Sequence, residues 1–127
     1  MATVTGGMNA AATNSTTYVD IIAAPGTSTR RNLQFISVYN ADSAIVTIIF
    51  EMYDGSSGFE FARATITSGN YLVITADPRD ASTTDDSTAV LLRKLTLNST
   101  SKKVRMKLAG AVATTQPHVV ANYLDYT

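Results

Sequence analysis

Hydrophobic and polar positions are most clearly organised between Asn32 and Tyr53, and this stretch predicts two β-strands joined by a turn. Both halves are dense in β-branched and aromatic residues, which favour strands. Between them, Asn40 to Ser43 supplies side chains that bond their own backbone and tolerate tight turns. We therefore expect the two strands to pair with each other as a hairpin, to which the other strands are added.

The second strand of this pair has two faces that differ in composition. One face is wholly apolar and is predicted to lie in the core. It consists of Ala44, Val46, Ile48, Phe50 and Met52. The opposite face carries Ile45, Ile49 and Tyr53, whereas a strand face in contact with water is normally more polar. We expect a neighbouring chain or segment to cover it, so these three residues are candidate interface residues.

The remaining strands are predicted from shorter alternating runs separated by turn residues. They cover residues 18–24, 59–66, 71–76, 88–97, 103–109 and 118–126. Together with the central pair they make about eight strands at regular spacing, with no sustained helical period. This rhythm predicts an all-β protein, a single antiparallel β-sandwich of the jelly-roll or immunoglobulin-like type.

The first 17 residues, MATVTGGMNAAATNSTT, are small, polar and nearly uncharged, which is typical of a flexible extended arm. Ordering such a segment costs on the order of 1 kcal/mol per residue in backbone entropy, so docking on a partner is the simplest way to order it. Small residues would allow the close approach of another backbone, and they are further candidate interface residues. They are Gly6, Gly7, Ala10, Ala11 and Ala12. The alternative is an edge strand of the same domain. We therefore divide the chain into an arm, 1–17, and a β-sandwich, 18–127.

The run from Lys103 to Ala109 alternates cleanly between apolar and basic residues. Val104, Met106 and Leu108 are predicted to point inward, and Lys103, Arg105 and Lys107 outward. Two interpretations stay open for these cations. They could meet a negatively charged partner, or they could protect an edge strand against unwanted pairing.

Composition and charge narrow the class of partner. A chain of 127 residues suits one domain, and its formal net charge is zero with 16% charged residues. Such a surface offers no electrostatic footprint for nucleic acid or a membrane, and weakly charged proteins tend to associate, so the expected partners are proteins. The chain lacks Cys, which suits folding in a reducing cytoplasm. With no apolar run of ~20 residues and no signal-peptide pattern, we expect neither a membrane span nor export.

Candidate chemistry is sparse. A catalytic triad would have to use His118, and Glu51 and Glu60 are the carboxylates on neighbouring predicted strands that could serve glycoside hydrolysis. The acidic loop at 77–87 could hold Ca²⁺ through Asp77, Asp80, Asp85 and Asp86, but their spacing matches no calcium loop. We expect no catalytic residue, no cofactor and no metal site.

Several stretches of the chain have a distinctive order. They are Tyr18-Val19, the turn Pro25-Gly26-Thr27, Arg30-Arg31, FISVYNADSAIVTIIFEMYDG and the ending LAGAVATTQPHVVANYLDYT. Together they resemble small β-sandwich virion proteins of tailed bacteriophages. The resemblance covers roughly residues 17–127 and carries no catalytic residues. It implies a non-enzymatic structural protein of a phage particle, on the capsid surface or in the neck or tail.

Two functions from different classes follow. We favour a capsid decoration or cement protein that binds the major capsid protein, associates with itself (a trimer by a symmetry-based guess) and resides in virions assembled in the host cytoplasm. The alternatives are a neck, tail or fibre component, or a carbohydrate-binding sandwich using Tyr71, Tyr123 and Tyr126. The absence of Trp weighs against sugar binding.

Overall fold

The computed structural model describes residues 3–13, 16–75, 90–91 and 95–127, and these residues form ten β-strands with no helix among them. The strands are β1 (Val4–Ala12), β2 (Val19–Ile22), β3 (Arg30–Tyr39), β4 (Val46–Tyr53), β5 (Gly58–Ile66), β6 (Tyr71–Thr75), β7 (Val90–Leu91), β8 (Thr96–Leu97), β9 (Lys103–Leu108) and β10 (His118–Tyr126). The predicted all-β class is confirmed.

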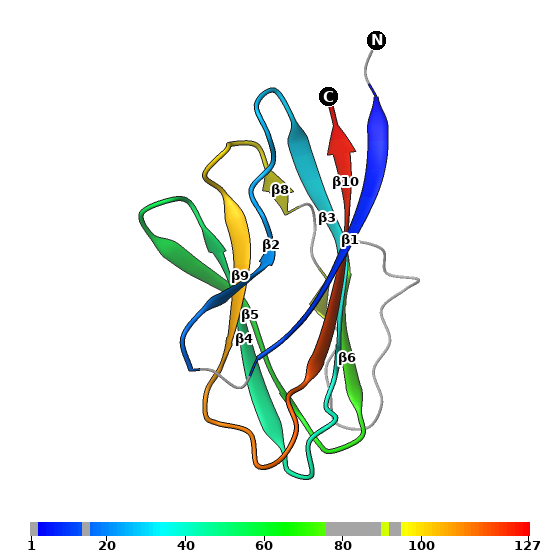
Figure 1. The fold of residues 1–127 in the computed structure, drawn as a ribbon, viewed down its shortest axis with the longest axis vertical. Helices are drawn as coiled ribbons and strands as arrows, with labels where there is room; N and C mark the ends of the chain where they lie inside the picture. Colours follow the sequence, from blue (N-terminus) through cyan, green and yellow to red (C-terminus); the bar gives the residue numbers. More distant parts are fainter. Residues whose placement is uncertain (1–2, 14–15, 76–89, 92–94) are drawn as a thin grey trace.

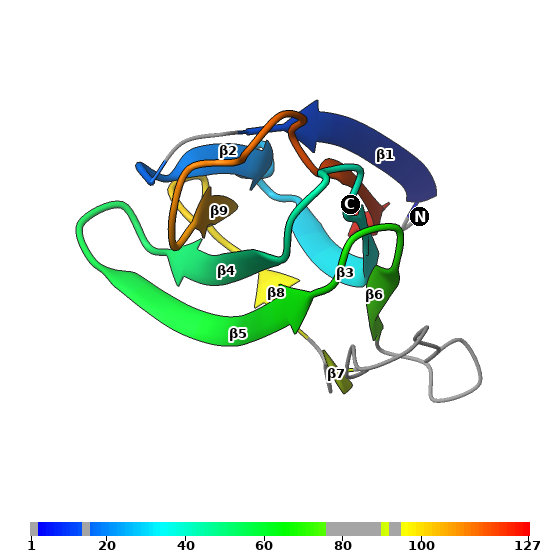
Figure 2. The same cartoon turned by 90° about the horizontal axis from the view of Figure 1, so that it is seen from below.

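The strands form two sheets packed face to face (Figures 1 and 2). The larger sheet has the order β1-β10-β3-β6-β7, with β8 also paired to β3, and the smaller has the order β2-β9-β4-β5. Neighbouring strands are antiparallel except for the parallel pair β6 and β7. The structure is therefore a β-sandwich, as the spacing of strands and turns predicts.

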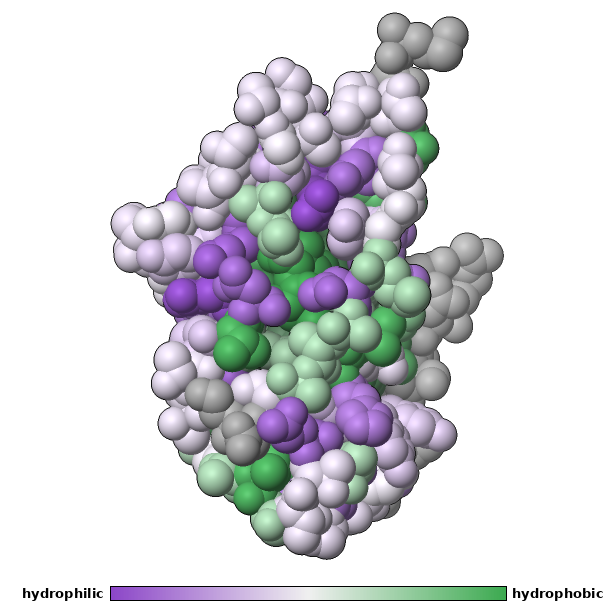
Figure 3. Space-filling model, in the orientation of Figure 1, coloured by the Kyte–Doolittle hydropathy of each residue, from purple (hydrophilic) through white to green (hydrophobic). Residues whose placement is uncertain are grey.

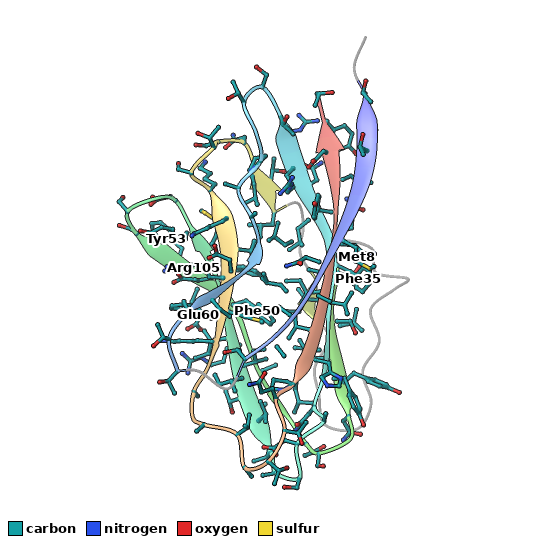
Figure 4. The ribbon with its side chains drawn as sticks, viewed as in Figure 1. Met8, Phe35, Phe50, Tyr53, Glu60 and Arg105 are labelled. Carbon is teal, nitrogen blue, oxygen red and sulfur yellow. The ribbon has the colours of Figure 1, made fainter. Side chains whose placement is uncertain are left out.

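The core lies between the two sheets and is built from alternate residues of each strand. Phe50 of β4, for example, points from the smaller sheet toward the larger one (Figure 4) and is fully buried. The other large side chains that are fully buried include Ile21, Leu33, Ile36, Ile48, Leu72, Ile74, Met106 and Leu108. Burying each such side chain contributes about 1.5–3 kcal/mol, so the period-two pattern supplies most of the driving force for this fold.

The predicted hairpin between residues 32 and 53 is wrong. β3 pairs with β10, β6 and β8 in the larger sheet, whereas β4 pairs with β5 and β9 in the smaller one. The segment between them is an arch that crosses from one sheet to the other. Asn40 stabilises this arch, because its buried side-chain amide donates to the carbonyls of Ala44 at 2.9 Å and Ile66 at 2.7 Å. The polar residues thus support a crossing rather than a two-strand turn.

Other predicted elements lie close to their observed places. β4 and β5 form a hairpin closed by the backbone bond from Asp54 to Ser57 at 3.0 Å, and β2, β9 and β10 lie within the predicted ranges. The strand predicted over 88–97 contains β7 and β8, with residues 88–89 and 92–94 outside the described residues. The acidic loop at 77–87, whose Asp residues are considered above as calcium ligands and not favoured, also lies outside them.

Residues 4–12 form the edge strand of the larger sheet, which is the alternative given above to an arm lying on a partner. β1 pairs with β10 in continuous antiparallel register, from Val4 opposite Tyr126 to Ala12 opposite His118. Backbone bonds between Thr3 and Thr127, at 3.2 and 3.1 Å, extend the ladder to the end of the chain. The division of the chain at residue 17 into separately folding parts stays a prediction.

Candidate interaction surfaces

The outer surface of the smaller sheet carries interleaved cations and tyrosines, which we call the cation–aromatic face. Its members are Tyr18, Glu51, Tyr53, Lys103, Arg105 and Lys107. The Arg105 guanidinium carbon lies 3.9 Å from the ring centre of Tyr53 and 4.9 Å from that of Tyr18. Figure 4 shows Tyr53, Arg105 and Glu60 on this side of the molecule, away from the core. Such cation–ring contacts contribute up to about 1 kcal/mol each at exposed sites.

Ion pairs neutralise the carboxylates on this face. Glu51, which is 5% exposed, accepts a hydrogen bond from Nε of Arg105 at 2.6 Å. On the neighbouring strand, Arg63 binds Glu60 at 2.8 Å and holds the pKa of that carboxyl below its usual range. Burial raises the pKa of the Tyr18 hydroxyl, and the nearby charges of Glu51 and Glu60 add to the effect. Glu51 and Glu60 are therefore each bound by an arginine of the same chain.

The three interface residues predicted on β4 and just before it fall in different environments. Ile45 is 58% exposed, Tyr53 is half-buried beneath the cations, and Ile49 is only 3% exposed. Ile49 lies opposite Arg63 on one side and Lys107 on the other, whose long apolar stems can cover it. The chain thus already buries Ile49, and Ile45 is the member of this set that offers surface to a partner. Whether a partner binds there stays a prediction.

The basic strand β9 lies inside its sheet, between β2 and β4. The interpretation of its cations as edge protection is therefore wrong. Val104, Met106 and Leu108 are buried as predicted. The alternation in the sequence correctly predicts which residues of β9 face outward. It does not predict that the rings of Tyr18 and Tyr53 contact these cations, because those contacts depend on the order of the strands in the sheet.

The outer surface of the larger sheet is more apolar, and we call it the apolar face. Val4 is 55% and Met8 69% exposed, and Figure 4 labels Met8 and Phe35 on the side of the larger sheet. Met8 and Phe35 flank Asn122 of β10 in register, on the face opposite the buried Ala121. At the other end of this face Tyr71, Tyr39 and His118 form a row, with ring centres 5.7 and 6.0 Å apart. Two side-chain oxygens of this face, on Asn32 and Asn122, are buried and have no hydrogen-bond partner among the described residues.

The small residues predicted as contacts all lie on β1, but they do not share one role. The ring of Tyr123 occupies the space that a side chain at Gly7 would need, and Ala11 packs against the core. Gly6, Ala10 and Ala12 remain exposed. These three, like Val4 and Met8, fall on the apolar face because their register partners alternate with buried residues of β10.

Glu51, Glu60 and His118, the described residues considered for chemistry, do not form a catalytic arrangement. Glu51 and Glu60 lie directly opposite each other, but each carboxylate is bound by an arginine, and the lowered pKa of Glu60 is the opposite of what a general acid needs. His118 is exposed at the start of β10, and its ring is tilted against that of Tyr39. Over the described ranges no cluster of His, Cys, Asp or Glu is suited to a metal ion, and no helix is long and apolar enough to cross a membrane.

Two of the three tyrosines considered for sugar binding have a ring face covered by an arginine of the same chain. Arg31 lies over the ring of Tyr123 at 4.0 Å, and Arg30 over that of Tyr126 at 5.0 Å. Tyr126 borders a groove of about 520 Å³ at the end of the sandwich where the two chain ends meet. Hydroxyl and amide side chains line much of this groove. They come from Thr27, Ser28, Thr29, Asn98, Ser99 and Thr100.

Comparison with known proteins gives a likeness among solved structures. No family model and no curated protein matches the chain. Among solved structures, it is similar to a chain of the cyanophage Pam1 capsid asymmetric unit, with a TM-score of 0.50 and 19% identity. The match covers 98% of this chain and 85% of the other, so both sheets take part in it. At this identity the likeness shows a shared fold.

Proposed function

We propose that the chain is a non-enzymatic structural protein of a tailed-phage particle, and specifically a capsid decoration or cement protein that binds the major capsid protein. The observation that carries this proposal is the fold shared over 98% of the chain with a cyanophage capsid chain. The sequence resemblance to small virion sandwiches supports it independently. The carboxylates that would serve hydrolysis are bound by arginines, which favours a structural role over an enzymatic one.

In this proposal attachment depends on surface burial rather than on a chemical step. The exposed apolar side chains, such as Ile45 and Met8, would be covered by coat subunits or by further copies of the chain. A stable contact of ordinary size buries about 800 Å² on each partner, which a few exposed side chains and one sheet edge can supply together. Virion location, self-association and coat binding all belong to this one proposal.

The experiment is to purify particles of the phage that encodes the chain and to count its copies by quantitative mass spectrometry and cryo-electron microscopy. A decoration protein should be present in fixed ratio to the coat protein, at symmetric positions on the capsid. Copies confined to one vertex or to the tail would instead identify a neck, tail or fibre component. Absence from purified particles would overturn the proposal.

The hydroxyl-lined groove beside Tyr126 favours carbohydrate binding as a second candidate function. Grooves of this kind suit sugars when an aromatic ring lies beside polar side chains, although Arg30 already covers one face of Tyr126. Binding to a panel of glycans, lost in Tyr126→Ala and kept in Tyr71→Ala, would support this function. No binding at millimolar sugar would exclude it.

A further inference from the structure

The outer edge of β1 carries a regular row of unused backbone groups. Thr3 and Thr127 each donate a backbone hydrogen bond to the other, so they form a hydrogen-bonded pair of the ladder. Because such pairs recur at every second residue and the register is continuous, the odd-numbered residues of β1 direct their N–H and C=O groups toward β10. The even-numbered residues direct theirs away from the sheet, and among the described residues no strand pairs with this edge. They are Val4, Gly6, Met8, Ala10 and Ala12, whose side chains lie on the apolar face.

This edge lacks the protection that the edges of the smaller sheet have. At the edge strand β2, the exposed Asp20 adjoins a register shift. At the opposite edge, β5 carries the exposed Glu60 and Arg63. β1 has nine residues without a charge or a proline and keeps an unbroken register. Figure 3 agrees, since hydrophilic purple gathers over β2 and β9 while the strip over β1 is largely white to green. A long uncharged edge of this kind is a template for strand addition.

We propose that β1 receives β1 of a second copy of this chain, antiparallel, across a two-fold axis at Met8. The outward-facing N–H and C=O groups of the even-numbered residues determine this register. These residues are spaced symmetrically about Met8, so this alignment alone pairs all of them, with Gly6 opposite Ala10 and Val4 opposite Ala12. The side chains brought together are small or apolar, and no like charges meet.

Two further observations favour a second copy as the occupant. The chain has a formal net charge of zero, so copies approach each other without long-range repulsion. Val4 and Met8, among the most exposed large apolar side chains, lie on this strand and would be covered by the pairing. The product is a dimer with one sheet continuous through both copies, in place of the trimer suggested by symmetry alone.

The inference specifies the self-association included in the proposed function and rests on it in that respect, but the isolated protein tests it without particles. The chain contains no Cys, so single cysteines report contacts cleanly. Across a two-fold axis at a hydrogen-bonded pair the two Cα atoms of residue 8 lie about 5.5 Å apart, within the range of a disulfide. Met8→Cys should therefore form a disulfide dimer on mild oxidation. Ile45→Cys, at a similarly exposed site outside β1 and just before β4 of the smaller sheet, is the matched control and should not.

Sedimentation velocity over a concentration series gives the second readout. The wild type should sediment as a dimer, and Met8→Lys, which sets two ammonium groups opposite each other, should weaken the dimer by about tenfold or more. Because Met8 is 69% exposed, circular dichroism should show this variant folded. A monomeric wild type at about 1 mM, a trimer, or a dimer that Ile45→Lys disrupts and Met8→Lys does not, would each overturn the proposal. A monomer in solution would leave the particle-composition test untouched.

Discussion

Asp42 connects parts of the chain that no local pattern relates. Its side chain is 2% exposed and accepts backbone hydrogen bonds from Ala113 at 2.8 Å, Thr114 at 2.8 Å and Thr115 at 3.1 Å. These donors stabilise the charged form and hold the pKa of Asp42 well below its usual range. The sequence predicts that residues 40–43 bond their own backbone, and Asp42 does so with Ser43 at 2.9 Å. Its partners about 70 residues later depend on the fold and could not be predicted.

The lowered pKa of Asp42 makes stability dependent on acid. Because the folded-state pKa is below the unfolded value of about 3.9, the unfolded chain binds the proton more readily in acid. The free energy of unfolding should be level above about pH 5 and fall as the pH drops through 4 and below. Urea melts from pH 7 to pH 2 should show a smaller acid loss for Asp42→Asn. Asp54→Asn, at an exposed turn with a pKa also lowered, is the control and should retain most of the loss. An unchanged acid slope in Asp42→Asn would contradict this account.

Arg105 should be more important for stability than the other cations of β9. Its removal leaves Glu51, which is 5% exposed, without its ionic partner, and an uncompensated buried charge is costly. We expect Arg105→Ala to lower the free energy of unfolding by about 2–4 kcal/mol. Lys103→Ala, whose partner Asp20 is half exposed, should cost under about 1 kcal/mol. Urea denaturation measures both variants, and equal losses of unfolding free energy in Arg105→Ala and Lys103→Ala would contradict this account.

At the scale of elements, strands are predictable but their partners are less so. The range of β10 and the inward face of β9 follow from period-two alternation, because burial on one face imposes it. The connection between β3 and β4 cannot be predicted in this way, because Asn, Asp and Ser suit both a tight turn and an arch. The pairing of β1 could not be predicted from composition either. This strand is rich in Gly and Ala and has no hydrophobic period, and it is held by backbone hydrogen bonds to the edge of β10.

The arch itself is testable through Asn40. This residue is fully buried, donates to Ala44 and Ile66, and accepts from the backbone of Asp42 at 2.9 Å. Asn40→Ala leaves these backbone groups unsatisfied, which should cost about 2–3 kcal/mol. Chemical denaturation checks this, with the exposed turn variant Ser56→Ala as the control. A loss below about 0.5 kcal/mol would mean that the arch does not depend on these bonds.

At the scale of the whole molecule, the ladder between β1 and β10 tests the division of the chain at residue 17. Deleting residues 1–12 would expose the edge of β10 and would remove the backbone of Gly7, against which the ring of Tyr123 packs. We expect the melting temperature to fall by about 10 °C or more, with aggregation through the uncovered edge. Deleting only residues 1–2 should leave it unchanged. A shortened chain that melts like the full-length protein would support the separate arm and sandwich.

The backbone bonds between Thr3 and Thr127 have a practical consequence for protein engineering. Both chain ends emerge at the same pole of the sandwich, whereas the arch lies at the opposite pole (Figure 1). A peptide or reporter fused to either end would therefore be displayed in the same direction. A short linker could also join the two ends, and new ends opened in the Asp54 to Ser57 turn would give a circular permutant with every strand of the ladder intact.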